Sequence, residues 1–274
     1  MVTDSRSNIE FNIQAHNKVA TKYAAIHGEI YNQCEQSRLH ASLKEAIGLV
    51  QCKDTTERMQ VLDLGCGAGN LTDHLVTMNA KVISADVSPN FLSQIRRRHP
   101  KTDVSTLQLN GSDLSNIEDA SIEMVATYSV LHHIPDYLGI IDECMRVLKP
   151  GGILYLDHEV PDEYWYNTAT LNKFYKDVQS VGPHILTKFF RPTNYIDFFI
   201  RKLYNPRYRR EGDIHVFPDD HIEWKKIAER VSKYGDMLIQ RDYLLYRSSF
   251  KVEVYEAHKA NLSDMRLAIY RKWS

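Results

Sequence analysis

Cysteine is scarce in this sequence and follows no recognisable pattern. No two of its four cysteines stand in C-x-x-C spacing, and they are scattered along the chain. Without that spacing the sequence predicts neither a structural zinc site nor a disulfide framework. We therefore expect a reducing, cytoplasmic location and no metal site. The cysteines are Cys34, Cys52, Cys66 and Cys144.

An excess of one charge and a long apolar segment are also lacking. With 34 Lys and Arg against 35 Asp and Glu, the formal net charge is −1, and this balance does not favour binding to nucleic acid. No segment approaches the length of a transmembrane helix, about 18 consecutive apolar residues. The amino terminus lacks the basic start and apolar run of an export signal. We expect no nucleic-acid partner, no membrane span and no export, and no feature of the sequence indicates an oligomeric state.

A regular alternation of strand and helix signals begins near residue 60. Short apolar runs alternate with segments whose apolar residues recur at helical spacing. Such alternation predicts a Rossmann-like, doubly wound α/β fold with a mainly parallel sheet covered on both faces. Two later runs are predicted to add an antiparallel pair at the edge, which makes seven strands. The expected strands are 61–64, 81–85, 104–109, 122–128 and 152–157, followed by 237–246 and 265–272.

The segments outside this core differ from it in composition. Residues 15–50 repeat apolar residues at helical spacing and predict a helical lid before the core. The residues that follow the core are rich in aromatics and predict an inserted helical cap that selects the substrate. A capping-box-like sequence at 220–223 predicts the start of the next helix. The expected division is 1–58 for the lid, 59–157 for the cofactor-binding core, 158–219 for the cap and 220–274 for the completion of the sheet.

A glycine-rich loop follows the first strand. The sequence DLGCGAGN, from Asp63 to Asn70, lies between a strand and a helix, where glycines allow a sharp turn and a close approach of a ligand to the backbone. Asp86 closes the second strand, 21 residues after Gly65. An acidic side chain at that place accepts hydrogen bonds from both hydroxyls of a ribose. Together, the loop and Asp86 predict a site for a nucleoside-containing cofactor.

Two details of the loop distinguish between cofactor classes. A dinucleotide-binding loop needs Gly or Ala at its sixth position and a helix N-terminus open to pyrophosphate, whereas Asn70 occupies that position here. The Asp63 carboxylate at the loop's entrance would repel a pyrophosphate but suits the ammonium group of a methionine moiety. The loop therefore favours a cofactor with a cationic amino-acid part, and a nicotinamide-dependent oxidoreductase is the alternative.

The same residues resemble the motifs of the class I S-adenosylmethionine-dependent methyltransferases. Val61 to Asn70 is similar to motif I of that family, and Asp86 is similar to the acidic residue of its second motif. Three further elements follow in the family's order, so the resemblance covers about 61–157. The subgroup that the chain most resembles is the ubiquinone/menaquinone-biosynthesis-like small-molecule methyltransferases. The further elements are 110–114 for the third motif, 128–135 for the fourth and 147–152 for the turn into strand five.

The resemblance implies S-adenosyl-L-methionine as the cofactor and a set of residues that contact it. Backbone around Gly65 and Tyr128 is expected at the methionine end, and Val87 against the adenine ring. Asp113 is expected at the adenine amino group, with a turn cap as its alternative role. Tyr23 of the lid is expected at the methionine carboxylate, with core packing as its alternative. The expected cofactor-binding residues are Tyr23, Asp63, Gly65, Cys66, Gly67, Asp86, Val87, Ser112, Asp113, Leu114, Tyr128 and Ser129.

Three histidines are candidates for a general base. His133 follows strand four at the carboxyl edge of the sheet, His158 ends strand five, and His215 lies in the inserted cap. A hydroxyl acceptor needs a proton acceptor nearby, whereas an amine needs only to arrive neutral. The alternative for each histidine is a buried, hydrogen-bonded structural role. No compact ligand spacing among these histidines and their acidic neighbours predicts a metal.

Basic residues gather between 191 and 210. Six of them outnumber the single acidic residue, Asp197, and aromatic residues are interleaved with them. This composition fits a site for a substrate phosphate or carboxylate, or contact with an anionic membrane surface. The alternative is a solvated helix face. The basic residues are Arg191, Arg201, Lys202, Arg207, Arg209 and Arg210.

These observations predict a methyltransferase with a small-molecule acceptor. The methyl group is expected to pass from S-adenosylmethionine to oxygen or nitrogen of an acidic or aromatic metabolite. Two alternatives stay open beside it: a nicotinamide-dependent oxidoreductase, and a non-catalytic subunit that binds S-adenosylmethionine while its acceptor pocket is blocked.

Overall fold

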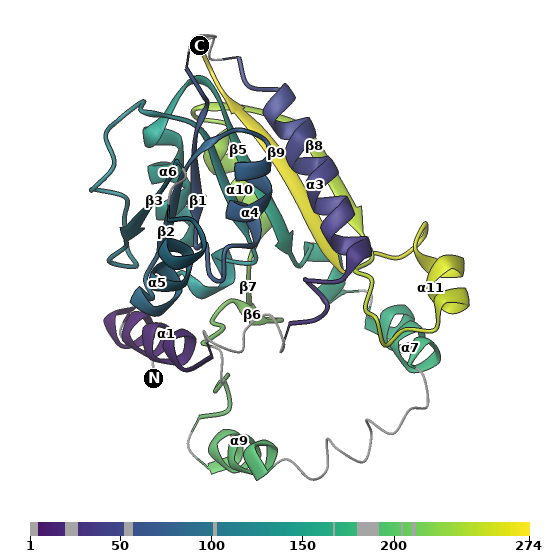
Figure 1. Cartoon of the computed structure of the whole chain (residues 1–274). Helices are drawn as coiled ribbons and strands as arrows, with labels where there is room; N and C mark the ends of the chain where they lie inside the picture. Colours follow the sequence, from purple (N-terminus) through teal and green to yellow (C-terminus); the bar gives the residue numbers. More distant parts are fainter. Residues whose placement is uncertain are drawn as a thin grey trace.

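A sheet of seven strands runs through the middle of this computed structural model (Figure 1). From one edge to the other, the strands are β3 (Val104–Gln108), β2 (Lys81–Asp86), β1 (Gln60–Leu64), β4 (Ile122–Tyr128), β5 (Leu148–Glu159), β9 (Met265–Lys272) and β8 (Gly235–Tyr243). The first five are parallel, and β9 runs antiparallel to both β5 and β8. The predicted doubly wound, mainly parallel fold with an antiparallel pair is confirmed. The structure describes residues 5–19, 27–51, 57–100, 103–166, 168–179, 192–203, 205–209 and 212–274.

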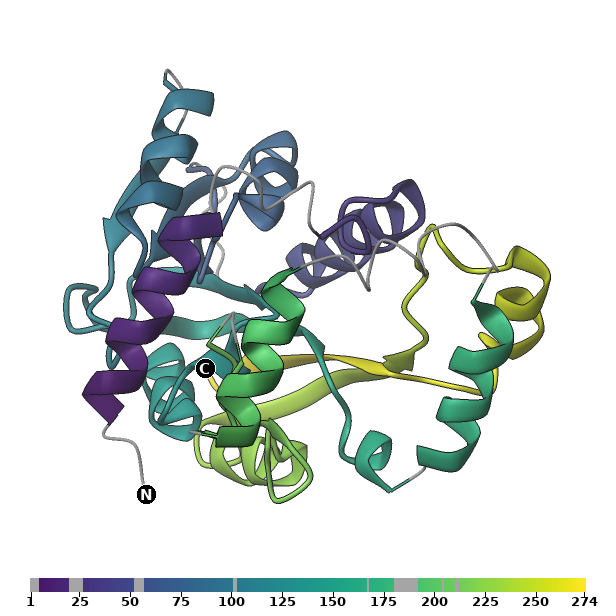
Figure 2. The same cartoon turned by 90° about the horizontal axis from the view of Figure 1, so that it is seen from below.

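Helices cover both faces of the sheet, as the view from below shows (Figure 2). One face carries α3 (Gln33–Gly48), α4 (Asn70–Thr77) and α5 (Pro89–Arg98), and the other carries α6 (Tyr137–Val147) and α10 (Trp224–Val231). Neighbouring strand residues enter opposite cores because strand side chains alternate between the faces. Val61 of β1 packs with α3 and α4, whereas Leu62 packs with α6 and α10.

The remaining elements lie mostly beyond the carboxyl ends of the parallel strands, at the lower end of Figure 1. Parallel α/β sheets bind their ligands at this end. An apolar cluster around Phe174 and Phe250 packs two of these helices, α7 (Thr168–Val178) and α11 (Val252–His258), against each other. The others are α1 (Ser5–Val19), η2 (Leu131–His133), η3 (Asp162–Trp165), α9 (Pro192–Leu203), β6 (Val216–Phe217) and β7 (Asp220–His221).

The helical lid expected over 15–50 has different bounds. α1 already begins at Ser5, and turns at 28–32 precede α3, which starts at Gln33. The side chain of Asn32 accepts a hydrogen bond from the Glu35 amide at 3.0 Å and caps α3 there. A new helix therefore starts at this cap, which apolar spacing alone does not reveal.

The helix expected to start at Asp220 begins at Trp224 instead. Asp220 and His221 pair with Val216 and Phe217 in a small hairpin. The Asp220 carboxylate lies 2.5 Å from Nδ1 of His215, so it is not available to cap the helix. That prediction was wrong because a contact within the β6–β7 hairpin segment engages the expected capping side chain.

The expected strand over 152–157 is longer in the structure, where β5 continues through Glu159. Two residues assigned to the inserted cap, His158 and Glu159, therefore belong to the sheet. The division into lid, core, cap and completion stays a prediction. None of the described helices is long and apolar enough to cross a membrane.

Candidate active site

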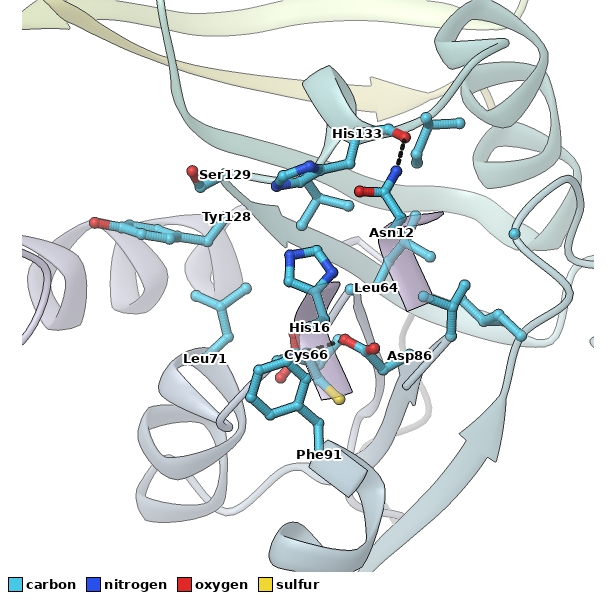
Figure 3. Close-up of a pocket in the computed structure, with 18 of the residues that line it drawn as sticks. Asn12, His16, Leu64, Cys66, Leu71, Asp86, Phe91, Tyr128, Ser129 and His133 are labelled. Atoms are coloured by element: carbon cyan, nitrogen blue, oxygen red, sulfur yellow. Dashed lines mark hydrogen bonds between the residues drawn. The ribbon is translucent and has the colours of Figure 1, made fainter. Parts of the chain in front are cut away.

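A pocket lies at the carboxyl ends of β1, β2 and β4 (Figure 3). The glycine loop between β1 and α4 forms one wall, the turn after β3 forms another, and α1 lies across the pocket. Every predicted cofactor-binding residue lines it except Tyr23 and Leu114. Tyr23 lies outside the described residues. Leu114 is buried in the core beneath the turn that carries Asp113.

Backbone constraints hold the glycine loop in shape. Gly65 has a φ of +69°, and a Cβ at this residue would lie 2.6 Å from Val130 Cγ1, so no larger residue fits. The amides of Gly65 and Cys66 donate to the Ala85 carbonyl at 2.8 and 3.0 Å and tie the loop to the end of β2. Burial raises the pKa of the Cys66 thiol well above its ordinary value, so Cys66 is not a nucleophile.

Asp86 places a fixed carboxylate in the pocket at the end of β2. Its two oxygens accept the amides of Gly67 at 2.9 Å and Ser88 at 2.7 Å, and 7% of the residue is exposed. Burial raises the pKa of Asp86 to about 6, so the carboxylate is ionised at neutral pH. Each oxygen keeps a further lone pair with which it can accept a hydroxyl group of a ligand.

Asp63 places a second buried carboxylate at the end of β1. The hydroxyl of Thr72 donates to it at 2.5 Å and also contacts the Ser84 hydroxyl at 2.7 Å. Burial raises the pKa of Asp63 to about 7. A cation in the pocket would favour the ionised form, whereas an anion would disfavour it. Asp63 therefore suits an ammonium group and opposes a phosphate.

Asp113 has the turn-stabilising role that the sequence analysis gave as its alternative, and its contact with adenine stays a prediction. The Asn110 side chain accepts the amides of Ser112 at 2.8 Å and Asp113 at 3.0 Å, which fixes the turn. Asp113 in turn accepts the amide of Ser115 at 3.0 Å, and hydrogen bonds from Ser115 and Asn110 lower the pKa of Asp113 to about 2. Asp113 thus stabilises the turn and also lines the pocket.

Helix α1 supplies pocket residues that the sequence analysis missed. Ile9, Asn12 and His16 enter the pocket from this helix. The His16 ring lies between Phe91 and His133, with ring centroids 6.1 and 4.9 Å apart (Figure 3). The Asn12 amide donates to the His133 carbonyl at 3.0 Å. Burial lowers the pKa of His16 to about 4, so a neutral imidazole faces the pocket.

A weak signal for this helix is present in the sequence. Ile9, Ile13 and His16 recur at intervals of four and three residues, which is helical spacing. The signal for its partner surface is Gly111, where a Cβ would lie 2.7 Å from Ile9 Cγ2. A glycine at this turn therefore lets α1 approach the sheet.

A buried ionic network joins α3 to the ends of β4 and β5. Arg38 donates to Asp157 at 2.9 Å and to Glu35 through Nε at 2.9 Å, and its guanidinium lies 4.0 Å from the centre of the Tyr243 ring. The Tyr128 hydroxyl donates to Glu35 at 2.9 Å. Burial raises the pKa of Glu35, and the hydrogen bond and positive charge of Arg38 oppose this rise. The network fixes the Tyr128 side chain beside the pocket.

Of the three candidate bases, His133 alone lines the pocket. Its ring contacts His16 and also His132, whose ring centroid is 4.2 Å away. Burial holds the pKa of His133 well below its ordinary value, and the two neighbouring histidines add to the effect. The imidazole is therefore neutral at physiological pH.

His158 lies at the carboxyl end of β5 with an unusual backbone. Its φ is +64°, in the left-handed region that residues other than glycine rarely adopt. The ring stacks on Tyr128 at a centroid distance of 4.5 Å, and neither ring nitrogen has a hydrogen-bond partner among the described residues. Burial lowers the pKa of His158 to about 3. A neutral imidazole with both nitrogens buried thus lies one ring away from the pocket.

His215 has the most complete set of partners. Its Nδ1 contacts Asp220 at 2.5 Å, and its Nε2 lies 3.1 Å from the Ile134 carbonyl and 3.3 Å from the Pro135 carbonyl. The Tyr137 ring packs edge-on against it at 5.1 Å. These contacts attach the β6–β7 hairpin to the loop after β4, outside the pocket.

The sequence predicts no metal site, yet the structure brings three potential metal ligands together. One ligand atom each from His132, His133 and Asp213 lies within 4.8 Å of the others. Nδ1 of His132 contacts Glu159 at 2.7 Å, which orients its ring. These residues follow β4 or belong to the cap, so their proximity depends on the fold.

Known proteins resemble this chain in sequence and in fold. Residues 62–156 match a family described as methyltransferase domain. A ubiquinone biosynthesis O-methyltransferase of Xanthomonas campestris pv. campestris is 30% identical over 144 residues, which covers 52% of this chain and 60% of that protein. The match thus spans less than two thirds of that relative. A protein of the same name from Methylococcus capsulatus is 25% identical over 208 residues, or 74% of this chain and 83% of that protein.

The fold is also found among solved structures. The N-methyltransferase NodS from Bradyrhizobium japonicum, solved in complex with S-adenosyl-L-homocysteine, superposes with a TM-score of 0.56. The sequence identity is 14%, and the superposition covers 95% of this chain and 98% of NodS. At that identity the two chains share the fold.

Proposed function

We propose that this chain, which belongs to the class I S-adenosylmethionine-dependent methyltransferases, transfers a methyl group to an oxygen atom of a small acidic or aromatic molecule. The observation that carries the proposal is the pair of buried carboxylates, Asp63 and Asp86, on either side of the glycine loop. The name O-methyltransferase of the curated relatives supports an oxygen acceptor. A non-catalytic subunit that binds the cofactor is the alternative.

The pocket residues fit S-adenosylmethionine. Asp86 offers a carboxylate to the ribose hydroxyls, Asp63 offers one to the ammonium group, and Val87 and Leu109 offer apolar surface to the adenine ring. When bound, the cofactor supplies an electrophilic methyl group on a positively charged sulfur. The chain's own residues must then hold the reactants in line and exclude water, which α1 promotes by placing His16 across the pocket.

An acceptor hydroxyl must also lose its proton. We assign this task to His158, because its nitrogens have no other partner among the described residues. His133 lines the pocket and is the second candidate. His215 is the weakest of the three because both of its ring nitrogens are engaged.

Replacing Asp86 with alanine is expected to weaken binding of S-adenosylhomocysteine by about 1–3 kcal/mol, or roughly 5- to 150-fold, as for loss of a charged hydrogen-bond acceptor. Calorimetric titration measures the affinity. Because the pKa of Asp86 is about 6, protonation should also weaken wild-type binding as the pH falls below that value. The pH effect should be absent from the variant.

The matched control is Asp119→Ala, which removes an exposed carboxylate outside the pocket, where Asp119 pairs with Arg146. This variant should bind S-adenosylhomocysteine like the wild type. Titration with NAD in parallel tests the oxidoreductase alternative. Equal affinity of the Asp86 variant and the wild type, or a preference for NAD, would contradict the cofactor assignment.

Methyl transfer itself tests the activity. The protein is incubated with methyl-labelled S-adenosylmethionine and a panel of phenols and hydroxy acids, and label is followed into the acceptors. Transfer to oxygen supports the proposal, whereas tight cofactor binding without transfer to any acceptor favours the non-catalytic alternative.

We also propose that α9 contacts an anionic membrane surface. Phe198, Phe199 and Leu203 are 52%, 55% and 66% exposed, and Arg201 and Lys202 are exposed among them. Exposed aromatic and basic residues on one helix are typical of helices that lie in the membrane interface. α9 lies beyond the carboxyl ends of the parallel strands (Figure 1), and the pocket is also at this end. We retain the predicted cytoplasmic location, in which the facing leaflet carries anionic lipid.

Flotation with lipid vesicles tests this contact. The wild type should float with phosphatidylcholine vesicles that contain phosphatidylglycerol. It should remain in the bottom fraction when the vesicles contain phosphatidylcholine alone. Replacing Phe198 and Phe199 with serine should abolish flotation because the apolar anchor is lost. The proposal fails if the wild type binds neither kind of vesicle or binds both equally.

A further inference from the structure

Asn70 begins α4 and lines the pocket, yet one end of its side-chain amide has no partner. Its Oδ1 accepts a hydrogen bond from Nε2 of Gln36 at 2.8 Å. Its Nδ2 is buried and has no hydrogen-bond partner among the described residues. Buried donors in folded proteins are nearly always hydrogen-bonded, so an unpaired amide in the wall of a pocket indicates a ligand group that accepts from it.

Neighbouring hydrogen bonds determine which end of the Asn70 amide is unpaired. Gln36 also donates from Nε2 to the Ile30 carbonyl at 3.0 Å, and its Oε1 lies 2.9 Å from Nε2 of His74. Nε2 of Gln36 is therefore a donor to both of its partners, and the Asn70 atom that faces it must be the acceptor oxygen. The Nδ2 group of Asn70 is left as the unpaired end.

The unpaired amide belongs to the turn of α4 that contacts Asp63. Thr72, two residues further along the helix, donates to the Asp63 carboxylate at 2.5 Å, and both Asn70 and Asp63 line the pocket. In the proposed complex Asp63 accepts the ammonium group of the methionine part. The carboxylate of an amino acid is bonded to the same carbon as its ammonium group, so it must lie in the same part of the pocket.

Among the lining residues that the structure describes, three are aspartates and none is a lysine or an arginine. These residues can therefore hold a carboxylate only through neutral donors, such as side-chain amides, hydroxyls and backbone N–H groups. The sequence predicts Tyr23 at the same carboxylate. Tyr23 lies outside the described residues, and the two oxygens of a carboxylate can accept from both side chains.

We infer that Asn70 donates a hydrogen bond from Nδ2 to the methionine carboxylate of S-adenosylmethionine, and that Gln36 is the positioning residue that holds the amide in this orientation. The inference rests on the proposed function and adds a cofactor-binding residue to it. It also gives a role to the residue that distinguishes this glycine loop from a dinucleotide-binding loop, which needs Gly or Ala at the same position.

The test uses decarboxylated S-adenosylmethionine, which keeps the ammonium group, the sulfonium and the nucleoside but lacks the carboxylate. Calorimetric titration compares its affinity with that of S-adenosylmethionine. The wild type should bind S-adenosylmethionine about tenfold or more tightly, as expected for hydrogen bonds to a charged group. Asn70→Ala should reduce this preference about tenfold through weaker binding of S-adenosylmethionine, while its affinity for the decarboxylated compound stays within about twofold of the wild type.

Asn70→Asp tests the same contact through charge. Aspartate keeps the oxygen that accepts from Gln36 and is favourable in the first turn of a helix, so the variant should fold. It should reduce the preference further than Asn70→Ala because two carboxylates repel each other. Gln36→Met leaves the lining residues unchanged and removes the orienting hydrogen bond, so it should lower the preference by a smaller factor.

Asn79→Asp is the matched control for Asn70→Asp. It introduces the same charge at an exposed residue just beyond the other end of α4, outside the pocket, and should keep the wild-type preference. The inference is overturned if the wild type binds both compounds equally, if Asn70→Ala keeps the wild-type preference, or if this variant loses affinity for both compounds equally. Failure of the wild type to bind either compound defeats the proposed function instead.

Discussion

The His158→Asn variant is expected to transfer methyl groups about 100- to 10,000-fold more slowly than the wild type, the range for loss of a general base. Asparagine tolerates the left-handed backbone that His158 adopts, with its φ of +64°, so the substitution should leave the end of β5 in place. The measurement is kcat with an acceptor found in the transfer screen, together with the affinity for S-adenosylhomocysteine. That affinity should stay unchanged because His158 does not line the cofactor pocket.

The corresponding His133→Asn variant separates the two candidate bases. His133 lines the pocket, so its replacement should alter cofactor affinity more than His158→Asn does. A large loss of kcat in His133→Asn, with little loss in His158→Asn, would assign proton removal to His133 instead.

The pH dependence of stability in the same variant tests the burial of His158 independently of activity. Burial lowers the pKa of His158 from 6.5 to about 3, so below pH 6.5 the unfolded chain binds a proton that the folded chain does not. Its contribution therefore reduces the free energy of unfolding by about 1.4 kcal/mol per pH unit as the pH falls from 6.5 toward 3. Denaturation at several pH values should show a shallower acid-side loss of stability in His158→Asn than in the wild type.

Replacing Arg38 with methionine should lower the free energy of unfolding by about 3–5 kcal/mol, the usual cost of removing one partner from a buried ion pair. Glu35 and Asp157 are 2% and 0% exposed, so each would remain buried without its cation. Urea denaturation measures the change. Because the total free energy of unfolding of a domain is about 5–15 kcal/mol, this loss should clearly lower the urea concentration at the midpoint of unfolding.

Arg241→Met serves as the matched control for Arg38. Its partner Glu45 is at the surface, where an ion pair contributes about 1 kcal/mol or less. Equal effects of the two substitutions would show that the Arg38 network contributes no more than a surface pair.

Local sequence signals account for the core of the fold and for the cofactor loop. The strands β1 to β5 were predicted because short apolar runs must be buried and helical segments between them show a different period. The glycine loop was predicted because glycines between a strand and a helix allow a sharp turn. The structure shows this at Gly65, which has a φ of +69°. Asp86 was predicted because the end of β2 lies at a known interval after that loop.

Contacts between distant segments account for what was missed. Arg38 and Asp157 are 119 residues apart, and their hydrogen bond forms only when α3 packs on β5. His16 enters the pocket only because α1 packs beside α5. In the same way, β9 lies between β5 and β8 through backbone pairing, which side-chain periodicity does not encode.

By itself, then, the sequence determined the alternation of strands and helices, the shape of the glycine loop and the carboxylate at the end of β2. Each depends on residues within one or two elements, whose periodicity and backbone preferences are readable along the chain. The tertiary structure alone decided that α1 lies across the pocket and that His158 is buried without a partner among the described residues. Those properties depend on which distant side chains exclude water from the same place, and burial of that kind exists only after the chain has folded.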